Sequence, residues 1–376
     1  MIDRRRLAVA GVYAGGFLGP FGGGVTAAML PELGADFDVS APAASATITA
    51  YLIPFATLML ISGTLGARWG LRRSVLGAYV VSIAGSAVCA ASTTFPLLLA
   101  GRGVQGVANA FTTPLLLATI AATTPRERLG RALGLFASLQ AAGQTTAPLL
   151  GGLAAEATWR LAFVGVAVAA AALAVIGLPP SAPSRAREPA RLRAAWRPDV
   201  LRAAAVALVG WGCLGGLTFL VAFRSDDGFG LSAGARGLLL TAFGVVGMLT
   251  ARLVGRLSER TGARTVALVG GLAGAVPVAL IGVVPWLPAL TLLWALAGFF
   301  AQFLQVGLNA LALTGTGSNP AGAVSVVQAF RFVGAALSPV AFTPVYHVSA
   351  VAGFLLPAAL LAVVTPLALL TRRPPH

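Results

Sequence analysis

Long apolar stretches, separated by short polar ones, follow each other along the whole chain. Each has about 18 to 25 residues, the length a helix needs to cross a hydrocarbon layer about 30 Å thick. The longest polar stretch, 179–200, is rich in proline and arginine and contains no helical pattern of apolar residues. The pattern predicts twelve spans, at 7–30, 42–66, 75–95, 97–121, 131–155, 160–178, 202–223, 237–256, 265–284, 287–312, 322–345 and 349–371.

We therefore expect an all-α membrane protein with twelve transmembrane helices. An N-terminal bundle of six helices at 1–178 is followed by a linker at 179–200 and a C-terminal bundle of six at 201–376. Hydrophobic residues make up 57% of the chain, charged residues 10%, and the mean hydropathy is +0.88, whereas a soluble domain has roughly 25% charged residues. The first span is too long for a removable signal peptide.

The net charge of +15 raises the question of a nucleic-acid partner. The arginines, however, collect in the loops on one side of the predicted membrane, while the loops on the other side hold six acidic residues and few arginines. This asymmetry predicts no nucleic-acid partner and places both termini in the cytoplasm. We expect a multi-pass membrane protein, surrounded by lipid. Arg160, Arg224 and Arg236 are exceptions, because they fall on the predicted outer side.

One phrase of the sequence occurs twice. The stretch "GTLGARWGLRRSV" at 63–75 returns 192 positions later as "GRLSERTGARTV" at 255–266, and "GQTTAP" at 143–148 is echoed by "GAALSP" at 334–339. Since six spans is an even number, the two halves are predicted to be parallel repeats related by a pseudo-twofold axis. The repeated glycines and arginines predict a tight cytoplasmic hinge in each half. These residues are Gly63, Arg68, Gly70 and Arg72 in the first copy and Gly255, Glu259, Arg260, Gly262 and Arg264 in the second.

The repeated loop is similar to the signature of the major facilitator superfamily, Gly-x-Leu-x-Asp-Arg-x-Gly followed by basic residues. The chain resembles the bacterial drug:proton antiporter branch of that family over nearly its whole length. Ala67 stands where the signature has Asp, while the second copy has Glu259. The resemblance implies that this acid locks a cytoplasmic gate through nearby arginines. We expect Glu259 to pair with Arg131 or Arg128.

The fourth span, "LLAGRGVQGVANAFTTP", is similar to a second family pattern through Leu98, Arg102, Gln105 and Gly106. Arg102, Gln105, Asn109 and Thr113 recur on one face of a helix. A polar stripe of this kind faces either the central cavity or a partner helix, because lipid does not solvate it. Asn109 and Thr113 are therefore candidate substrate contacts, with hydrogen bonding between helices as the alternative. The resemblance implies a role in proton coupling for Arg102.

The fifth span is rich in small residues. Gly143, Pro148, Gly151 and Gly152 match the spacing of the antiporter signature, in which small residues let helices approach closely and proline adds a bend. The resemblance implies a gating role, and a glycine-rich packing face is the alternative. Gln140 and Gln144 of the same span are candidate substrate contacts.

Arg331 lies near the middle of the eleventh span, where an unpaired charge is costly. No acidic residue lies in the middle of any predicted span, so we expect Arg331 to meet a neutral or anionic substrate in a water-filled cavity. Bonding to helix carbonyls and Gln328 is the alternative. The remaining candidate substrate contacts in this half are Gln328, Gln302, Gln305, Asn309 and Phe303.

The sequence as a whole predicts a monomeric transporter that exports an amphipathic small molecule by alternating access, coupled to protons. Glu32, within reach of Arg102, is the expected proton carrier, with Asp36 as the next candidate. An uptake carrier or facilitator of the same fold is the alternative, and a receptor that transports nothing is a third. The sequence has no phosphate-binding loop and no zinc spacing, so we expect no enzyme activity, cofactor or metal.

Overall fold

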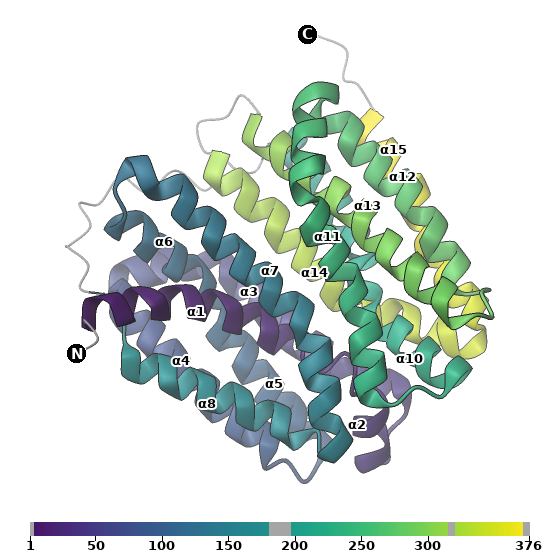
Figure 1. The fold of residues 1–376 in the computed structure, drawn as a ribbon, viewed down its shortest axis with the longest axis horizontal. Helices are drawn as coiled ribbons and strands as arrows, with labels where there is room; N and C mark the ends of the chain where they lie inside the picture. The colour runs from purple at the N-terminus through teal and green to yellow at the C-terminus, as the bar shows by residue number, and fades with distance from the viewer. Residues whose placement is uncertain (1–3, 180–196, 315–319, 371–376) are drawn as a thin grey trace. The chain divides into compact units, whose positions relative to one another are not determined.

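The computed structural model describes residues 4–179, 197–314 and 320–370, and the regular elements in these ranges are all helical (Figure 1). The chain divides into two compact units, which are described separately. Unit 1 is Met1–Ala186 with Leu231–Thr241, and unit 2 is Arg187–Gly230 with Ala242–His376. Most of the predicted linker, 180–196, lies outside the described residues.

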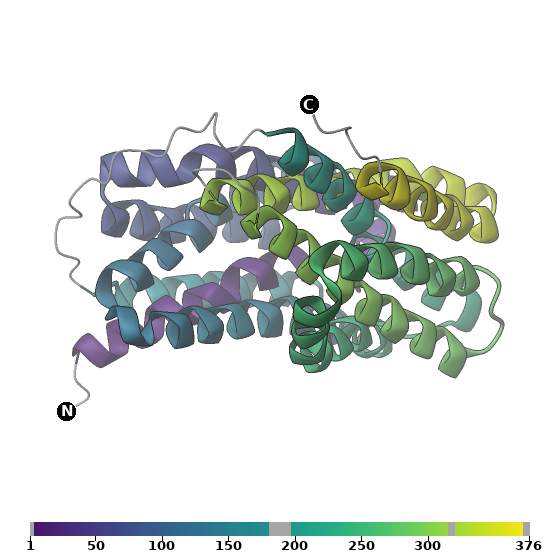
Figure 2. The same ribbon diagram turned by 90° about the horizontal axis from the view of Figure 1, so that it is seen from above.

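Unit 1 is built from the helices of the first half and the first turns of α11. Helix α1 packs on α7, α3 on α5, and α4 on α8 (Figures 1 and 2). Val12, Tyr79, Leu116, Phe136 and Val166 come from five different helices and share one buried core. The helices are α1 (Arg4–Gly24), α2 (Leu30–Asp36), α3 (Ala41–Trp69), α4 (Leu71–Ala90), α5 (Phe95–Ala110), α6 (Thr113–Thr123), α7 (Arg126–Ala157) and α8 (Arg160–Ile176).

Unit 2 contains the helices of the second half. Helix α12 packs against both α13 and α15, and α9 packs against α14. Phe303 joins Val254 and Val266 in a buried cluster. The elements are α9 (Pro198–Gly212), the 3-10 helix η2 (Gly215–Leu217), α10 (Thr218–Phe229), α11 (Ala233–Thr261), α12 (Ala263–Ile281), α13 (Leu287–Thr314), α14 (Pro320–Val348) and α15 (Ala350–Leu370). Across the described ranges, eight helical segments are long and apolar enough to cross a membrane.

Two predicted spans are broken rather than continuous. The fourth ends as α5 at Ala110 and resumes as α6 at Thr113, because the ring of Pro114 clashes with the carbonyl four residues earlier, that of Ala110. The seventh ends as α9 at Gly212 and resumes as α10 at Thr218, across the flexible pair Gly215 and Gly216. The expectation of one continuous helix from Arg102 to Thr113 is therefore wrong.

The two copies of the repeated loop have the same backbone conformation. Gly70 joins α3 to α4 with φ 91° and ψ 127°, and Gly262 joins α11 to α12 with φ 89° and ψ 145°. Residues with a Cβ rarely adopt a φ in this range, so both turns require glycine. The sharp turn predicted from the repeated phrase is present in both halves.

Close helix packing is also repeated. A Cβ at Gly106 would overlap the carbonyl oxygen of Tyr51. In the second half, a Cβ at Gly298 would overlap the carbonyl oxygen of Phe243, and each of these two residues lies 192 positions after its counterpart. Gly143 packs in the same way on the carbonyl of Phe17, and Gly334 on that of Leu208, at a separation of 191. The sequence echoes at 143–148 and 334–339 thus mark equivalent contacts with the first helix of each half.

Candidate functional site

Arg102 is fully buried in α5 of unit 1 and caps the end of α1. It donates hydrogen bonds to the carbonyl oxygens of Gly22 (2.8 Å) and Gly23 (3.3 Å), which lie in the last turn of α1. Carbonyls in that turn have no partner within their own helix and carry partial negative charge, so a cation is favourable there. Arg102 also donates to the carbonyl of Thr47 in α3 (3.3 Å). The arginine therefore ties three helices together.

Side chains complete the surroundings of Arg102. Its guanidinium donates to Gln105 Oε1 (2.8 Å) and lies 4.4 Å from the centre of the Tyr51 ring. Gln105 in turn donates to Ser86 Oγ at 2.8 Å. The guanidinium carbon also lies 5.9 Å from the centre of the Phe163 ring, and Glu32 pairs with Arg236 rather than with Arg102. The expected contact between Glu32 and Arg102 is corrected accordingly.

A small cavity of about 20 Å³ lies beside Arg102 in unit 1. Gln105, Asn109, Tyr51 and the buried hydroxyl-bearing Tyr79 line it, together with glycines of α1. The side-chain oxygens of Asn109 and Thr113 both lie close to Gly19 of α1. Despite the break between α5 and α6, both side chains therefore face α1. Thr113 and the two other candidates from this half, Gln140 and Gln144, are not among its lining residues.

Arg236 holds the acidic end of unit 1, which we define by Glu32, Asp36 and Glu156. It is 2% exposed and lies in the first turns of α11. It donates to the carbonyls of Ala28 (3.1 Å) and Leu231 (2.7 Å) and forms an ion pair with Glu32. Glu32 Oε2 is buried and has no hydrogen-bond partner in the described part of the chain. One oxygen of this carboxylate is thus paired and the other is not.

The beginning of α11 also meets the glycine-rich helix α7. Glu156 Oε1 accepts from the Gly234 amide at 2.8 Å. Hydrogen bonds from Ser232 and from this amide, with Arg236 nearby, hold the pKa of Glu156 below its usual range. A Cβ at Gly152 would overlap the carbonyl oxygen of Ala233, so the contact requires glycine there.

The other signature residues of α7 are also packing positions. Gly151 lies against the Val25 carbonyl oxygen, and the Pro148 carbonyl lies against Gly237. Together with Gly143 on α1, these contacts place the glycines where backbones approach most closely.

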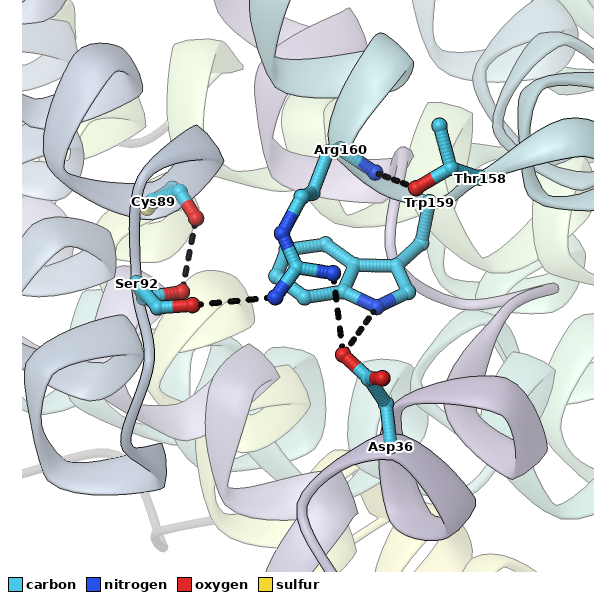
Figure 3. Close-up of polar contacts among 6 residues, drawn as sticks. All are labelled: Asp36, Cys89, Ser92, Thr158, Trp159 and Arg160. Atoms are coloured by element: carbon cyan, nitrogen blue, oxygen red, sulfur yellow. Dashed lines mark hydrogen bonds and ion pairs between the residues drawn. The ribbon is translucent and has the colours of Figure 1, made fainter.

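Asp36 joins a separate polar cluster at the acidic end (Figure 3). Its Oδ2 accepts from Trp159 Nε1 and from Arg160, both at 3.0 Å. Arg160 also donates to the carbonyl of Ser92 (3.1 Å) and lies over the Trp159 ring at 4.2 Å. Asp36 therefore fastens α2 to the start of α8 and the end of α4.

Arg331 in α14 borders a cavity in unit 2, between α9, α13 and α14. Its guanidinium carbon lies 4.2 Å from the centre of the Trp211 ring and 4.7 Å from that of Phe332. Its Nε is buried and has no hydrogen-bond partner in the described ranges. Gln305, Asn309 and Gln328 also line this cavity, and their contact with a substrate stays a prediction.

Two other candidates of this half lie elsewhere. Phe303 is 6% exposed and packs in the cluster with Val254 and Val266, so it is a core residue. Gln302 points toward Gly247 of α11 rather than into the cavity of Arg331. The aromatic residue that lines the cavity is Trp211, which no motif or polar stripe in the sequence marked.

The predicted gating loops are exposed. Arg68 and Arg72 lie at Gly70, and Glu259, Arg260 and Arg264 lie at Gly262. Gly63 and Gly255 lie within α3 and α11. The side chains of Arg128 and Arg131, the expected partners of Glu259, are outside the described residues, so that pairing stays a prediction.

The structure also accounts for the three arginines that departed from the charge asymmetry. Arg160 pairs with Asp36, Arg236 with Glu32, and Arg224 donates to the carbonyl of Val284 at 3.0 Å. Their departure from the pattern was the one signal in the sequence that could have pointed to Arg236.

The profile of the Major Facilitator Superfamily matches residues 12–235 and 226–376. The chain belongs to this family. It is 33% identical to a chloramphenicol resistance protein of Streptomyces lividans over 261 residues, which cover 65% of each chain. It is 35% identical to a methylenomycin A resistance protein of Bacillus subtilis over 129 residues, 34% of this chain and 28% of the relative. The matches thus span from about a quarter to about two thirds of these relatives' own length.

Solved structures of the same fold cover nearly the whole chain. A bacterial homolog of the human lysosomal transporter Spinster, in an inward-facing and unoccupied conformation, matches with a TM-score of 0.77 at 18% identity, over 98% of this chain and 97% of that one. The human organic anion transporter MFSD10 matches with a TM-score of 0.69 at 19% identity, over 97% and 100%.

The chain is therefore a multi-pass membrane protein of the Major Facilitator Superfamily, and the relatives named above are called resistance proteins. The twelve predicted spans fit its fold, with the fourth and seventh each divided into two helices.

Proposed function

We propose that this chain is a secondary active transporter that exports an amphipathic small molecule by alternating access, in exchange for protons. The observation that carries the direction is that several relatives confer resistance to antibiotics, namely methylenomycin, chloramphenicol and lincomycin. Each unit contains a small, mainly apolar cavity whose lining residues include amide side chains and aromatic rings, a mixture suited to an amphipathic ligand.

The proton-linked group in this proposal is Glu32. Its carboxylate has one oxygen on Arg236 and one buried oxygen without a hydrogen-bond partner among the described residues. A proton on that second oxygen removes the charge that holds Arg236, which also binds the carbonyls of Ala28 and Leu231. Protonation would therefore weaken the contact between the α1–α2 connection and the beginning of α11.

Arg102 acts in this proposal through position rather than by direct contact with Glu32. It fixes the last carbonyls of α1, while Arg236 fixes the connection that follows. The two arginines hold the same segment at its two ends. Asp36, paired with Arg160 and Trp159, is the second candidate for proton coupling.

The gating loops at Gly70 and Gly262 would turn at the opposite ends of the spans from these acids. Cytoplasmic termini, an inner-membrane location and a monomeric state complete the proposal. The charge asymmetry of the loops supports the orientation.

The experiment is efflux of a substrate panel from bacterial cells that lack their major exporters, followed by transport in inverted vesicles. Wild type is expected to expel substrates only when a proton gradient is imposed. Uptake in cells, or equal transport without a gradient, would contradict proton-driven export and favour an uptake carrier or facilitator.

A variant pair tests the proton-linked residue. Glu32→Gln is expected to abolish gradient-driven transport while leaving substrate binding, whereas the matched Asp36→Asn is expected to retain coupling. If Glu32→Gln keeps coupled efflux, Glu32 is not the proton carrier, and loss in Asp36→Asn alone would assign that role to Asp36.

A further inference from the structure

Arg331 has donor capacity that the described part of the protein does not use. Its Nε is buried without a hydrogen-bond partner, and it forms no ion pair with any described residue. A buried donor without an acceptor is unfavourable, so such a group needs an explanation. Arg102 shows the contrast, because four hydrogen bonds and two ring contacts surround its guanidinium within unit 1.

The Trp211 ring fixes how the guanidinium of Arg331 lies. With the guanidinium carbon 4.2 Å from the ring centre, Arg331 covers one face of Trp211. That face is the one that would otherwise attract a cationic ligand in this cavity. The ring therefore serves as a platform for the arginine, and a second cation beside it would meet a like charge in a poorly solvated place.

The other lining residues are neutral. Gln305, Asn309 and Gln328 provide amide groups, and the remaining described lining residues besides Trp211 and Arg331 are aliphatic. The cavity volume is about 10 Å³, close to the space that one water molecule or one ligand oxygen fills. The site thus fits a single polar group, with the rest of a ligand lying outside it.

We propose that the cavity of Arg331, Trp211, Gln305, Asn309 and Gln328 is a subsite for a carboxylate, or an equally flat anionic group, on the transported molecule. One carboxylate oxygen would fill the cavity beside the guanidinium, and the second oxygen would lie outside it with the body of the ligand. The residue 191 positions earlier in the repeat is the neutral Gln140, so this positive charge belongs to the second half alone. The inference rests on the proposed function and names the substrate class.

The test uses three matched probes with the same naphthalene body: 1-naphthoate, 1-naphthamide and 1-naphthylmethylammonium. Binding to the purified full chain in lipid nanodiscs is measured by quenching of tryptophan fluorescence and by calorimetry. Wild type is expected to bind the naphthoate about 10-fold to 100-fold more tightly than the amide. It is expected to bind the ammonium most weakly.

Two variants assign that preference to Arg331. Arg331→Gln is expected to reduce the preference for naphthoate over naphthamide to about 1-fold to 3-fold, while Arg331→Lys keeps part of it because the charge remains without the planar fork. The control is Arg256→Gln, which removes one exposed positive charge from α11 and is expected to leave all three affinities unchanged.

Three results would overturn the proposal: preference of wild type for the ammonium, no saturable naphthoate binding by wild type, or an unchanged naphthoate preference in Arg331→Gln. The first two need no variant, so they hold even if Arg331→Gln does not fold. Binding requires no proton gradient. A chain that binds naphthoate but exports nothing would contradict the proposed function alone, and one that exports the ammonium preferentially would contradict the anionic subsite alone.

Discussion

Units 1 and 2 retain the same helix contacts but carry their charge at different places. Gly106 packs on the backbone of Tyr51, and 192 positions later Gly298 packs on that of Phe243. Arg102 lies over Tyr51 at 4.4 Å, whereas its counterpart Trp294 stacks on Phe243 with ring centres 4.6 Å apart. The glycine contact between the two helices is thus the same in both units, but Arg102 in unit 1 is replaced by Trp294 in unit 2.

In the pair of helices α7 and α14, the positive charge lies in unit 2 instead of unit 1. Unit 2 carries its cation at Arg331, and the corresponding residue in unit 1 is Gln140. The end of α9, which corresponds to the end of α1, has its Gly212 carbonyl bound by Ser338 at 2.8 Å rather than by an arginine. One arginine is thus saturated by backbone carbonyls and the other is not. We infer that the first is structural and the second is available to a ligand.

The largest expected effect separates these two arginines. Arg102→Gln leaves the buried carbonyls of Gly22, Gly23 and Thr47 without a donor, and we expect a loss of about 3 kcal/mol or more in stability. Arg331→Gln loses mainly its contact with Trp211, about 0.5–2 kcal/mol. Thermal unfolding in detergent with size-exclusion analysis measures both. Equal destabilisation would remove the distinction between a structural and a ligand-binding arginine.

The shared packing gives the next prediction. Gly106→Ala and Gly298→Ala place a methyl group against the backbone of the neighbouring helix in each unit, and each is expected to cost about 1–3 kcal/mol. Gly165→Ala in α8 is the control, because a Cβ there meets no atom within 4 Å. It is expected to be neutral or stabilising by up to about 1 kcal/mol. If only one of the two glycines is sensitive, the repeat is not preserved at this contact.

A smaller effect is expected at the repeated turns. Gly70 and Gly262 have φ near 90° and no atom within 4 Å of a built Cβ, so alanine at either position introduces backbone strain without a clash. We expect a loss of about 1–2 kcal/mol for each substitution, of similar size in both units. Unfolding midpoints of the two single variants test this. A loss in one turn but not the other would show that the loops have diverged in their conformational requirement.

The smallest expected effect concerns Glu156. Its lowered pKa means that its contact with the beginning of α11 is present above the ordinary pKa of a glutamate and is lost as the pH falls through the lowered value. Hydrogen exchange of the segment 231–241 should therefore be slower in wild type than in Glu156→Gln at pH 6, and this difference should disappear once the pH has fallen below the lowered pKa of Glu156. A difference that persists below that pH would exclude the carboxylate as its cause.

The sequence alone determined the features that depend on local pattern. Span length predicted the helices, and the repeated phrase predicted turns whose backbone only glycine adopts readily, as Gly70 and Gly262 confirm. The polar stripe of α5 correctly marked Arg102 as facing inward, and Gln305, Asn309, Gln328 and Arg331 do line one cavity. The break between α5 and α6 was missed, although the proline that causes it, Pro114, acts locally.

Only the tertiary structure decided the partners. Arg102 binds carbonyls 55 to 80 residues away, and backbone carbonyls have no signature in a sequence. Glu32 pairs with Arg236 rather than with Arg102, across 204 residues. Trp211 supports Arg331 because α9 packs on α14 through Gly334. Periodicity specifies which face of a helix is polar, but the neighbour of that face depends on how closely the glycines allow distant backbones to approach.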